Sequence, residues 1–152
     1  MTELSILPAS ETDIDAICLL LNELFSQEAD FAADSAKQRR AVIEILSQPD
    51  RGQILILKKD GQVVGMVNLL YLMSTAMGGK VAMLEDMIIA ERCRSQGLGQ
   101  QLLTAAIDFA RQQGCRRITL LTDADNERAQ QFYQKHGFNH SAMLPMRRVF
   151  EE

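Results

Sequence analysis

The sequence predicts an α/β fold in which a mixed, mainly antiparallel central sheet is flanked by helices. Three observations support this class: apolar runs on both sides of an Asp-Gly turn, helical apolar spacing in both halves of the chain, and short β-type runs between the helical segments. The chain has 152 residues, of which 47% are hydrophobic and 24% are charged, as in globular proteins. Because this is the length of one ordinary domain, we expect residues 1–152 to form a single domain.

The first third of the chain predicts a strand followed by two helices. Residues 3–8 alternate apolar and polar side chains and end at a proline, which is typical of a short strand. Residues 10–27 form an amphipathic helical pattern, with Ser10 or Thr12 available as the N-cap. Residues 35–48 repeat the pattern more weakly and are followed by a proline that stops the helix.

The middle of the chain changes to strand patterns. Residues 52–59 and 62–72 are apolar runs joined by the Asp-Gly pair, which readily adopts the positive φ angles of a tight hairpin turn. Residues 80–90 form a third apolar run, and residues 73–79 before it predict a loop. We therefore expect three consecutive strands here.

The last third alternates helices and strands. Helical spacing begins at Gly97 and ends near Gly114, and residues 115–122 form a short strand pattern. Residues 123–137 predict a second helix, and residues 138–150 predict a final pair of strands. The expected order is therefore β-α-α-β-β-β-α-β-α-β-β.

Composition excludes several function classes. The net charge of −4 gives no general reason to bind nucleic acid, and no apolar run approaches the length that spans a membrane. The three cysteines, Cys18, Cys93 and Cys115, are odd in number and too widely spaced for a zinc site or a disulfide framework. We expect a cytoplasmic protein that uses no metal and has neither a nucleic acid nor a membrane as partner.

A candidate anion site lies at a strand-to-helix junction, in the stretch "RCRSQGLGQQLL" at residues 92–103. The first N–H groups of a helix have no partner within it, and the helix dipole is positive at that end. Gly97 and Gly99 remove side chains that would keep a phosphate from the backbone, and Arg94 adds a charge. Glycines at such a turn can also serve tight packing alone. The stretch lacks the third glycine of a dinucleotide fingerprint and the Gly-Lys-Ser/Thr of a P-loop.

Two motifs carry a family resemblance. The segment "LEDMIIAERCRSQGLGQQLL" resembles the central motif of the GNAT superfamily of acyl-CoA-dependent N-acetyltransferases, a strand followed by Arg/Gln-x-x-Gly-x-Gly/Ala and a helix. The segment "DADNERAQQFYQKHGF" resembles the next motif of that family, at Asn126, Ala129, Phe132, Tyr133, Gly137 and Phe138. The two motifs cover residues 83–138, and the element order along the chain is also similar to that of the family.

The resemblance implies a binding site for acetyl-CoA. In the family, the strand before the phosphate loop carries a bulge and splays from the next strand, and the pantetheine arm pairs with its backbone. Here this would involve Met87, Ile88 and Ile89. Asn126 would approach the cofactor from the following helix. The pyrophosphate would be received next to Arg94 by the backbone N–H groups of Ser95, Gln96, Gly97, Leu98, Gly99 and Gln100.

The resemblance also implies an acid and a base. Tyr133 would lie near the thioester sulfur as the candidate general acid, although a core aromatic with a solvated tip would have the same pattern. Glu85 is the first candidate for the general base, acting directly or through a water. The pattern fits equally well with Glu85 as an ordinary solvated carboxylate. Some similar enzymes use water chains without a fixed base. Asp86 would face the opposite side of the strand unless a bulge changes the alternation.

The sequence therefore predicts an acetyl-CoA-dependent N-acetyltransferase that acts directly on a primary amine of a small molecule or a peptide. A non-catalytic CoA-binding regulatory module and a nucleotide-phosphate binder of unrelated fold remain as alternatives. A homodimer could form through exchange of the C-terminal strands. The acceptor is left open, because the acidic residues in and after the first helix fit either a cationic amine or a solvated surface; they are Glu23, Glu28, Asp30 and Asp34.

Overall fold

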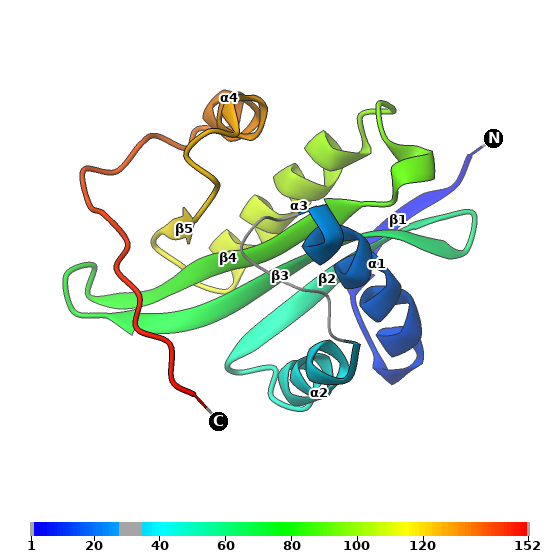
Figure 1. The fold of residues 1–152 in the computed structure, drawn as a ribbon, viewed down its shortest axis with the longest axis horizontal. Coiled ribbons are helices and arrows are strands. Elements are labelled where there is room, and N and C mark those ends of the chain that lie inside the picture. Colours follow the sequence, from blue (N-terminus) through cyan, green and yellow to red (C-terminus); the bar gives the residue numbers. More distant parts are fainter. Residues whose placement is uncertain (1, 28–34, 152) are drawn as a thin grey trace. The chain divides into compact units, whose positions relative to one another are not determined.

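The computed structural model describes residues 2–27 and 35–151, which form two compact units, Met1–Leu121 and Thr122–Glu152 (Figure 1). The predicted acidic positions Glu28, Asp30 and Asp34 lie outside the described residues.

The first unit is built on one sheet. Its described strands have the order β1-β2-β3-β4-β5; the first four pair antiparallel, and β5 pairs parallel to β4. This confirms the predicted mixed, mainly antiparallel sheet. The strands are β1 (Leu4–Pro8), β2 (Gly52–Lys59), β3 (Gln62–Ser74), β4 (Gly79–Ile89) and β5 (Ile118–Leu120).

The β2–β3 hairpin follows directly from the local sequence. Asp60 and Gly61 have φ angles of 50° and 82°, so both central turn positions are left-handed, as a tight hairpin with matching twist requires. Lys59 and Gln62 are paired across the turn. β3 is longer than expected. It runs to Ser74 and so includes the first two residues of the loop predicted at residues 73–79.

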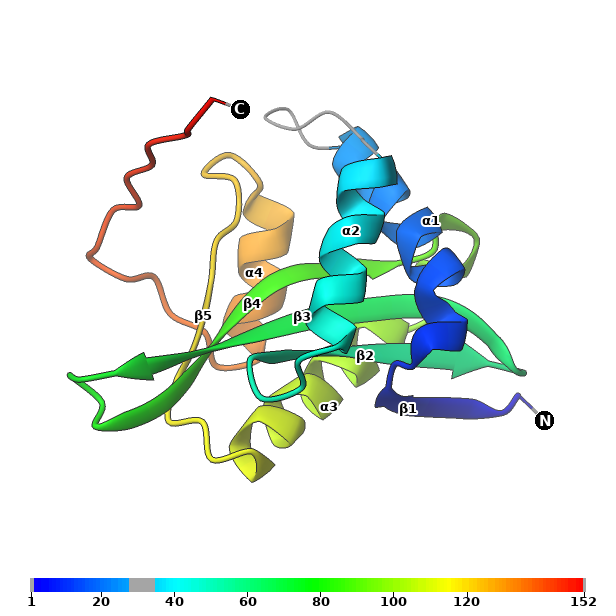
Figure 2. The same ribbon diagram turned by 90° about the horizontal axis from the view of Figure 1, so that it is seen from below.

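Helices cover both faces of this sheet. Figure 2 shows α1 and α2 on one face and α3 on the other. Leu102 of α3 approaches Gly65, and Ile89 lies beside Gly65 on the same face. The helices are α1 (Ile14–Gln27), α2 (Ser35–Leu46) and α3 (Leu98–Gln112), with short 3-10 turns η1 (Glu11–Asp13) and η2 (Glu91–Cys93).

The core lies on both faces of the sheet, as the helical periodicity predicted. Ile17 of α1 and Val42 of α2 are buried. Leu102 and Ala106 of α3 are fully buried. Ser10 precedes the first helical turn, and its backbone N–H donates to the Asp13 carboxylate at 2.9 Å, which fixes the start of this segment. Within the described residues, no helix is both long and apolar enough to cross a membrane.

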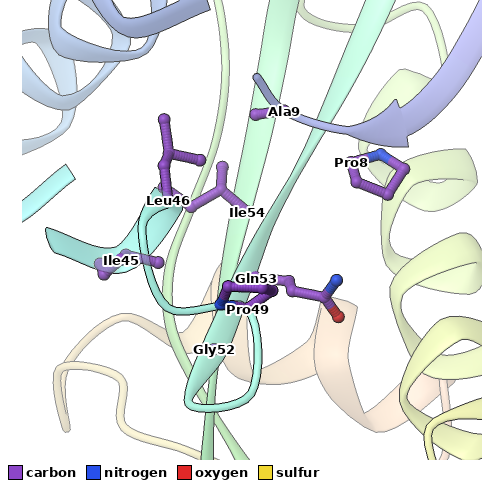
Figure 3. Close-up of a pocket in the computed structure, with 8 residues that line it drawn as sticks. All are labelled: Pro8, Ala9, Ile45, Leu46, Pro49, Gly52, Gln53 and Ile54. Atoms are coloured by element: carbon purple, nitrogen blue, oxygen red, sulfur yellow. The ribbon is translucent and has the colours of Figure 1, made fainter. Parts of the chain in front are cut away.

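A small pocket of about 50 Å³ lies in the first unit where the end of α2 meets β1 and β2 (Figure 3). This volume holds at most a few waters and is far too small for an acyl donor. Its lining is mostly apolar and comprises Pro8, Ala9, Ile45, Leu46, Pro49, Gly52, Gln53 and Ile54.

The second unit contains α4 (Glu127–Lys135) and an extended C-terminal segment. The pair of strands predicted at residues 138–150 is wrong, because residues 138–151 form neither helix nor strand. A two-stranded hairpin is marginal without a neighbouring strand, and the described residues of this unit include none. The apolar side chains that produced the strand pattern are at least 78% exposed; they are Met143, Leu144, Met146, Val149 and Phe150.

Candidate active site

The junction between β4 and α3 has a backbone shaped by two left-handed positions. Ser95 has φ 66°, and Gly97, the N-cap of α3, has φ 77°. A left-handed non-glycine residue is uncommon and often marks a functional loop. No heavy atom lies within 4 Å of where a Gly97 side chain would begin, so the space in front of the helix is open.

The first turn of α3 presents free backbone donors to this space. Gly97 has no side chain to cap the helix, and the first N–H that bonds back to Gly97 is that of Gln101, at 3.3 Å. The N–H groups of Leu98, Gly99 and Gln100 precede that bond and therefore have no acceptor inside the helix. With the positive end of the dipole behind them, they form a site for an anion.

Two cations border the loop. Arg94 is exposed and donates through Nε to the Ile89 carbonyl at 3.1 Å, which ties its side chain to the end of β4. Lys59, at the end of β2, donates through Nζ to Gln96 Oε1 at 2.8 Å. Sequence reasoning missed Lys59, because it reaches the loop from a strand 37 positions away along the chain.

The outer edge of β4 is open beyond Leu84. β5 pairs only with Ala82, Met83 and Leu84, so within the described residues the backbone from Glu85 to Ile89 has no strand partner on that side. Met87, Ile88 and Ile89, for which the family resemblance implies pairing with a pantetheine arm, lie in this unpaired stretch. Ile88 is buried, whereas Met87 and Ile89 are half-buried.

The predicted bulge is also present. Asn68 pairs with Asp86, whereas Leu69 pairs with Leu84, so Glu85 is an extra residue without an opposite partner. Glu85 is exposed. The bulge therefore changes the alternation on which the predicted directions of Glu85 and Asp86 depended.

Asp86 is a partly buried carboxylate with a perturbed pKa. Asn68, which is 4% exposed, donates through Nδ2 to Asp86 Oδ2 at 3.3 Å. Burial raises the pKa of Asp86 to about 6; the Asn68 hydrogen bond lowers it, and the negative charge of Glu85 raises it further. A carboxylate with a pKa near neutrality is suited to accept and release a proton at physiological pH.

In the second unit, Asn126 and Tyr133 lie on α4 and its cap. Asn126 caps the helix, with its Oδ1 accepting the Ala129 N–H at 3.0 Å. This hydrogen bond gives Asn126 a structural role at the start of α4.

Tyr133 is held in an aromatic cluster. Its ring packs edge-on against Phe132 at 5.3 Å and Phe138 at 5.7 Å between centroids. Burial raises the pKa of Tyr133 above its ordinary value, so the hydroxyl stays protonated at neutral pH. The His136 ring packs on Phe132, and its Nδ1 lies within hydrogen-bond distance of the Phe132 carbonyl oxygen, at 2.9 Å.

The sequence profile of the Acetyltransferase (GNAT) family matches residues 15–138, across both units. The chain belongs to this family. It is an enzyme of the acyltransferase class, an N-acetyltransferase. Members of the family use acetyl-CoA, and the described residues contain no group of three or more His, Cys, Asp or Glu side chains that could hold a metal ion.

The chain is similar to known proteins over most of its length. An uncharacterised N-acetyltransferase from Bacillus subtilis, YhfO, is 28% identical over 138 residues and 89% of each chain. The aminoalkylphosphonate N-acetyltransferase of Salmonella typhimurium is 29% identical over 133 residues, 88% of this chain and 83% of that protein. The aminoglycoside N-acetyltransferase AAC(6')-Iy, solved in complex with CoA, shares the fold with a TM-score of 0.81 at 20% identity, covering 98% of this chain and 96% of the other.

Proposed function

We propose that this GNAT enzyme transfers an acetyl group from acetyl-CoA directly to a primary amine of a small molecule or a peptide. One observation supports it most: the open edge of β4 beyond Leu84 leads, through the β4–α3 junction, to the uncapped start of α3. An extended pantetheine arm needs an unpaired strand edge, and a pyrophosphate needs free N–H donors. This stretch of chain supplies both in that order.

The proposed donor site uses the predicted residues. The backbone of Met87, Ile88 and Ile89 pairs with the amides of the pantetheine arm. The N–H groups from Ser95 to Gln100 and the Arg94 guanidinium bind the pyrophosphate, with Lys59 as an additional cation beside the loop. Asn126 approaches the cofactor from α4. Because the family profile crosses both units, we treat residues 1–152 as one functional domain.

The proposed chemistry moves two protons. The acceptor ammonium loses one proton to a carboxylate beside the β4 bulge, where Glu85 is the predicted base and Asp86 lies next to it. The neutral amine then attacks the acetyl carbonyl, and the oxyanion is stabilised by a β4 backbone N–H near Met87 or Ile88. Tyr133 protonates the departing thiolate, a role that its raised pKa favours.

The relatives support a small amine as acceptor. The names of two similar proteins state that they acetylate aminoalkylphosphonates and aminoglycosides, both of which carry amines. Three free cysteines fit a reducing, cytoplasmic location, which we include in the proposal. A homodimer formed through residues 143–150 is also proposed, because the apolar side chains of this segment are exposed.

The test is an acetyl-transfer assay on a panel of amines that includes n-butylamine, 2-aminoethylphosphonate, an aminoglycoside and a lysine peptide. We expect thiol release that depends on the amine, with an acetylated product of equal amount detected by mass spectrometry. Tight binding of acetyl-CoA without product from any amine would instead indicate a non-catalytic CoA-binding module.

A further inference from the structure

The turn directly before α3 has few hydrogen bonds of its own. The backbone bonds of the preceding 3-10 turn end at Arg94, whose N–H donates to the Glu91 carbonyl at 3.3 Å. Within the described part of the chain, the N–H groups of Ser95, Gln96 and Gly97 donate to no acceptor. Backbone pairing therefore does not fix the conformation of this turn.

That conformation also has an intrinsic cost. Ser95 has φ 66° and Gly97 has φ 77°, and Gln96 lies between these two left-handed residues. A residue other than glycine adopts such a φ angle at a cost in free energy, and it keeps this angle only where the surrounding structure imposes it. A contact from outside the turn is therefore needed at or near Gln96.

Lys59 makes this contact. Its Nζ atom donates to Gln96 Oε1 at 2.8 Å. Among the described residues, this is the one hydrogen bond in which either Ser95 or Gln96 takes part. Hydrogen bonds from an ammonium group are stronger than those between neutral groups. The bond thus connects the turn to the sheet at the residue between its two left-handed positions.

The strand end that carries Lys59 is held firmly. Lys59 is paired on both sides, with Leu4 of β1 and Gln62 of β3. The next residue, Asp60, donates its N–H to the Glu3 carbonyl at 2.8 Å, and its Oδ1 accepts the Glu3 N–H at 2.8 Å. Lys59 therefore joins an irregular loop to a strand that is fixed by both of its neighbours.

The charge of Lys59 is not used in an ion pair. No salt bridge between described residues includes it, whereas the Nζ atom of the adjacent Lys58 lies 3.8 Å from Asp13 Oδ1. Side chains alternate along a strand, so the two lysines point to opposite faces of the sheet. Lys59 thus places an uncompensated positive charge beside the proposed phosphate site, which favours an anion there.

We propose that Lys59 is a positioning residue for the acetyl donor. Through Gln96, it keeps the turn before α3 in the conformation that presents free N–H groups to the pyrophosphate. This inference rests on the proposed acetyl-CoA site and adds to it a residue that acts on the loop and does not touch the reacting atoms. A loop that is already ordered loses less entropy when it binds its ligand, so the donor binds more tightly.

The expected effect follows from the fraction of protein molecules whose loop is competent to bind. The apparent Kd equals the intrinsic Kd divided by that fraction. Gln96 is exposed, so the bond competes with water and its loss has a moderate effect. If about a tenth to a third of the molecules keep a competent loop without it, the Kd for acetyl-CoA rises about three- to tenfold.

The first test is calorimetric titration of Lys59→Met and Lys58→Met with acetyl-CoA and with CoA. We expect Lys59→Met to bind both ligands about three- to tenfold more weakly than the wild type. Lys58→Met is the matched control, because it removes the same charge from the adjacent position on the opposite face. It should bind as the wild type does. Thermal melting of each variant checks that the fold is retained.

A double-variant cycle tests whether Lys59 acts through Gln96. Gln96→Leu should weaken acetyl-CoA binding by about the same factor as Lys59→Met, and the double variant should be no weaker than either single variant. Lys59→Arg keeps the charge and the donor groups, and should retain most of the affinity. If Lys59 instead contacted a phosphate directly, Gln96→Leu would bind as the wild type does.

A donor without phosphates separates this role from a general structural one. S-acetylpantetheine lacks the pyrophosphate, so the conformation of the phosphate loop should matter less for it. With the best acceptor of the amine panel, the ratio of kcat/KM for acetyl-CoA to that for S-acetylpantetheine should fall about three- to tenfold in Lys59→Met. An equal loss with both donors would show a structural role alone.

Three results would overturn the inference: equal affinity of Lys59→Met and the wild type for acetyl-CoA, an equal loss in Lys58→Met, or additive losses in the double variant. Failure of the proposed function has a different outcome. Wild-type protein would then neither bind acetyl-CoA nor acetylate any amine, whatever residue stands at position 59.

Discussion

Replacing Asp86 with asparagine should stabilise the fold in a pH-dependent way. The pKa of Asp86 is raised by burial from 3.8 to about 6, a shift of about 2 units that corresponds to about 3 kcal/mol. The native state binds the proton more tightly than the unfolded chain, so this group stabilises the protein below pH 4. That contribution is lost as the pH rises through 6. Asparagine stays neutral and has no such dependence.

The quantity to measure is the unfolding free energy of Asp86→Asn minus that of the wild type. It should rise by about 1.5 kcal/mol between pH 5 and pH 8, roughly half of the full effect, because the unfolded-state carboxyl is already mostly ionised at pH 5. Urea unfolding followed by far-UV circular dichroism is suitable, since the chain has no tryptophan. Asp108→Asn, at an exposed position of α3, serves as the matched control. A difference that stays constant with pH would refute the reasoning.

Three further substitutions test the fold, the acid and the assembly. Leu102→Ala should lower the unfolding free energy by about 2–5 kcal/mol in urea titration, because this fully buried side chain packs between α3 and the sheet. Tyr133→Phe should lower kcat at least tenfold while leaving the acetyl-CoA Kd unchanged; unchanged turnover with chemistry rate-limiting would remove the acid role. Met146→Glu, at a 97% exposed position, should shift the proposed homodimer to monomer in sedimentation experiments, and identical sedimentation of the two proteins would count against that interface.

The elements that the sequence predicted correctly have local causes. The hairpin follows from Asp60 and Gly61, whose backbone preferences determine the turn. The start and end of α3 follow from helical periodicity and from Gly97 and Gly114. These signals act within a few residues and need no knowledge of the rest of the fold.

The features that the sequence did not predict depend on distant partners. Residues 138–150 contain short apolar runs, yet strand formation needs a neighbouring strand, and the described residues of the second unit provide none. Lys59 reaches the phosphate loop only because the sheet brings the end of β2 to it. The pairing of Asn68 with Asp86 depends on a bulge at Glu85, which shifts the register by one residue.

Calorimetric titration with acetyl-CoA tests the proposed donor site most directly. Wild-type protein should bind acetyl-CoA, and Gly97→Asp should not, because it places a negative charge at the helix start where the pyrophosphate would bind. Gly114→Asp is the matched control, since Gly114 also has a positive φ and open space around it but follows the other end of α3. Binding by wild type and Gly114→Asp alone is the predicted result. Absence of binding to the wild type, or equal binding by Gly97→Asp, would contradict it.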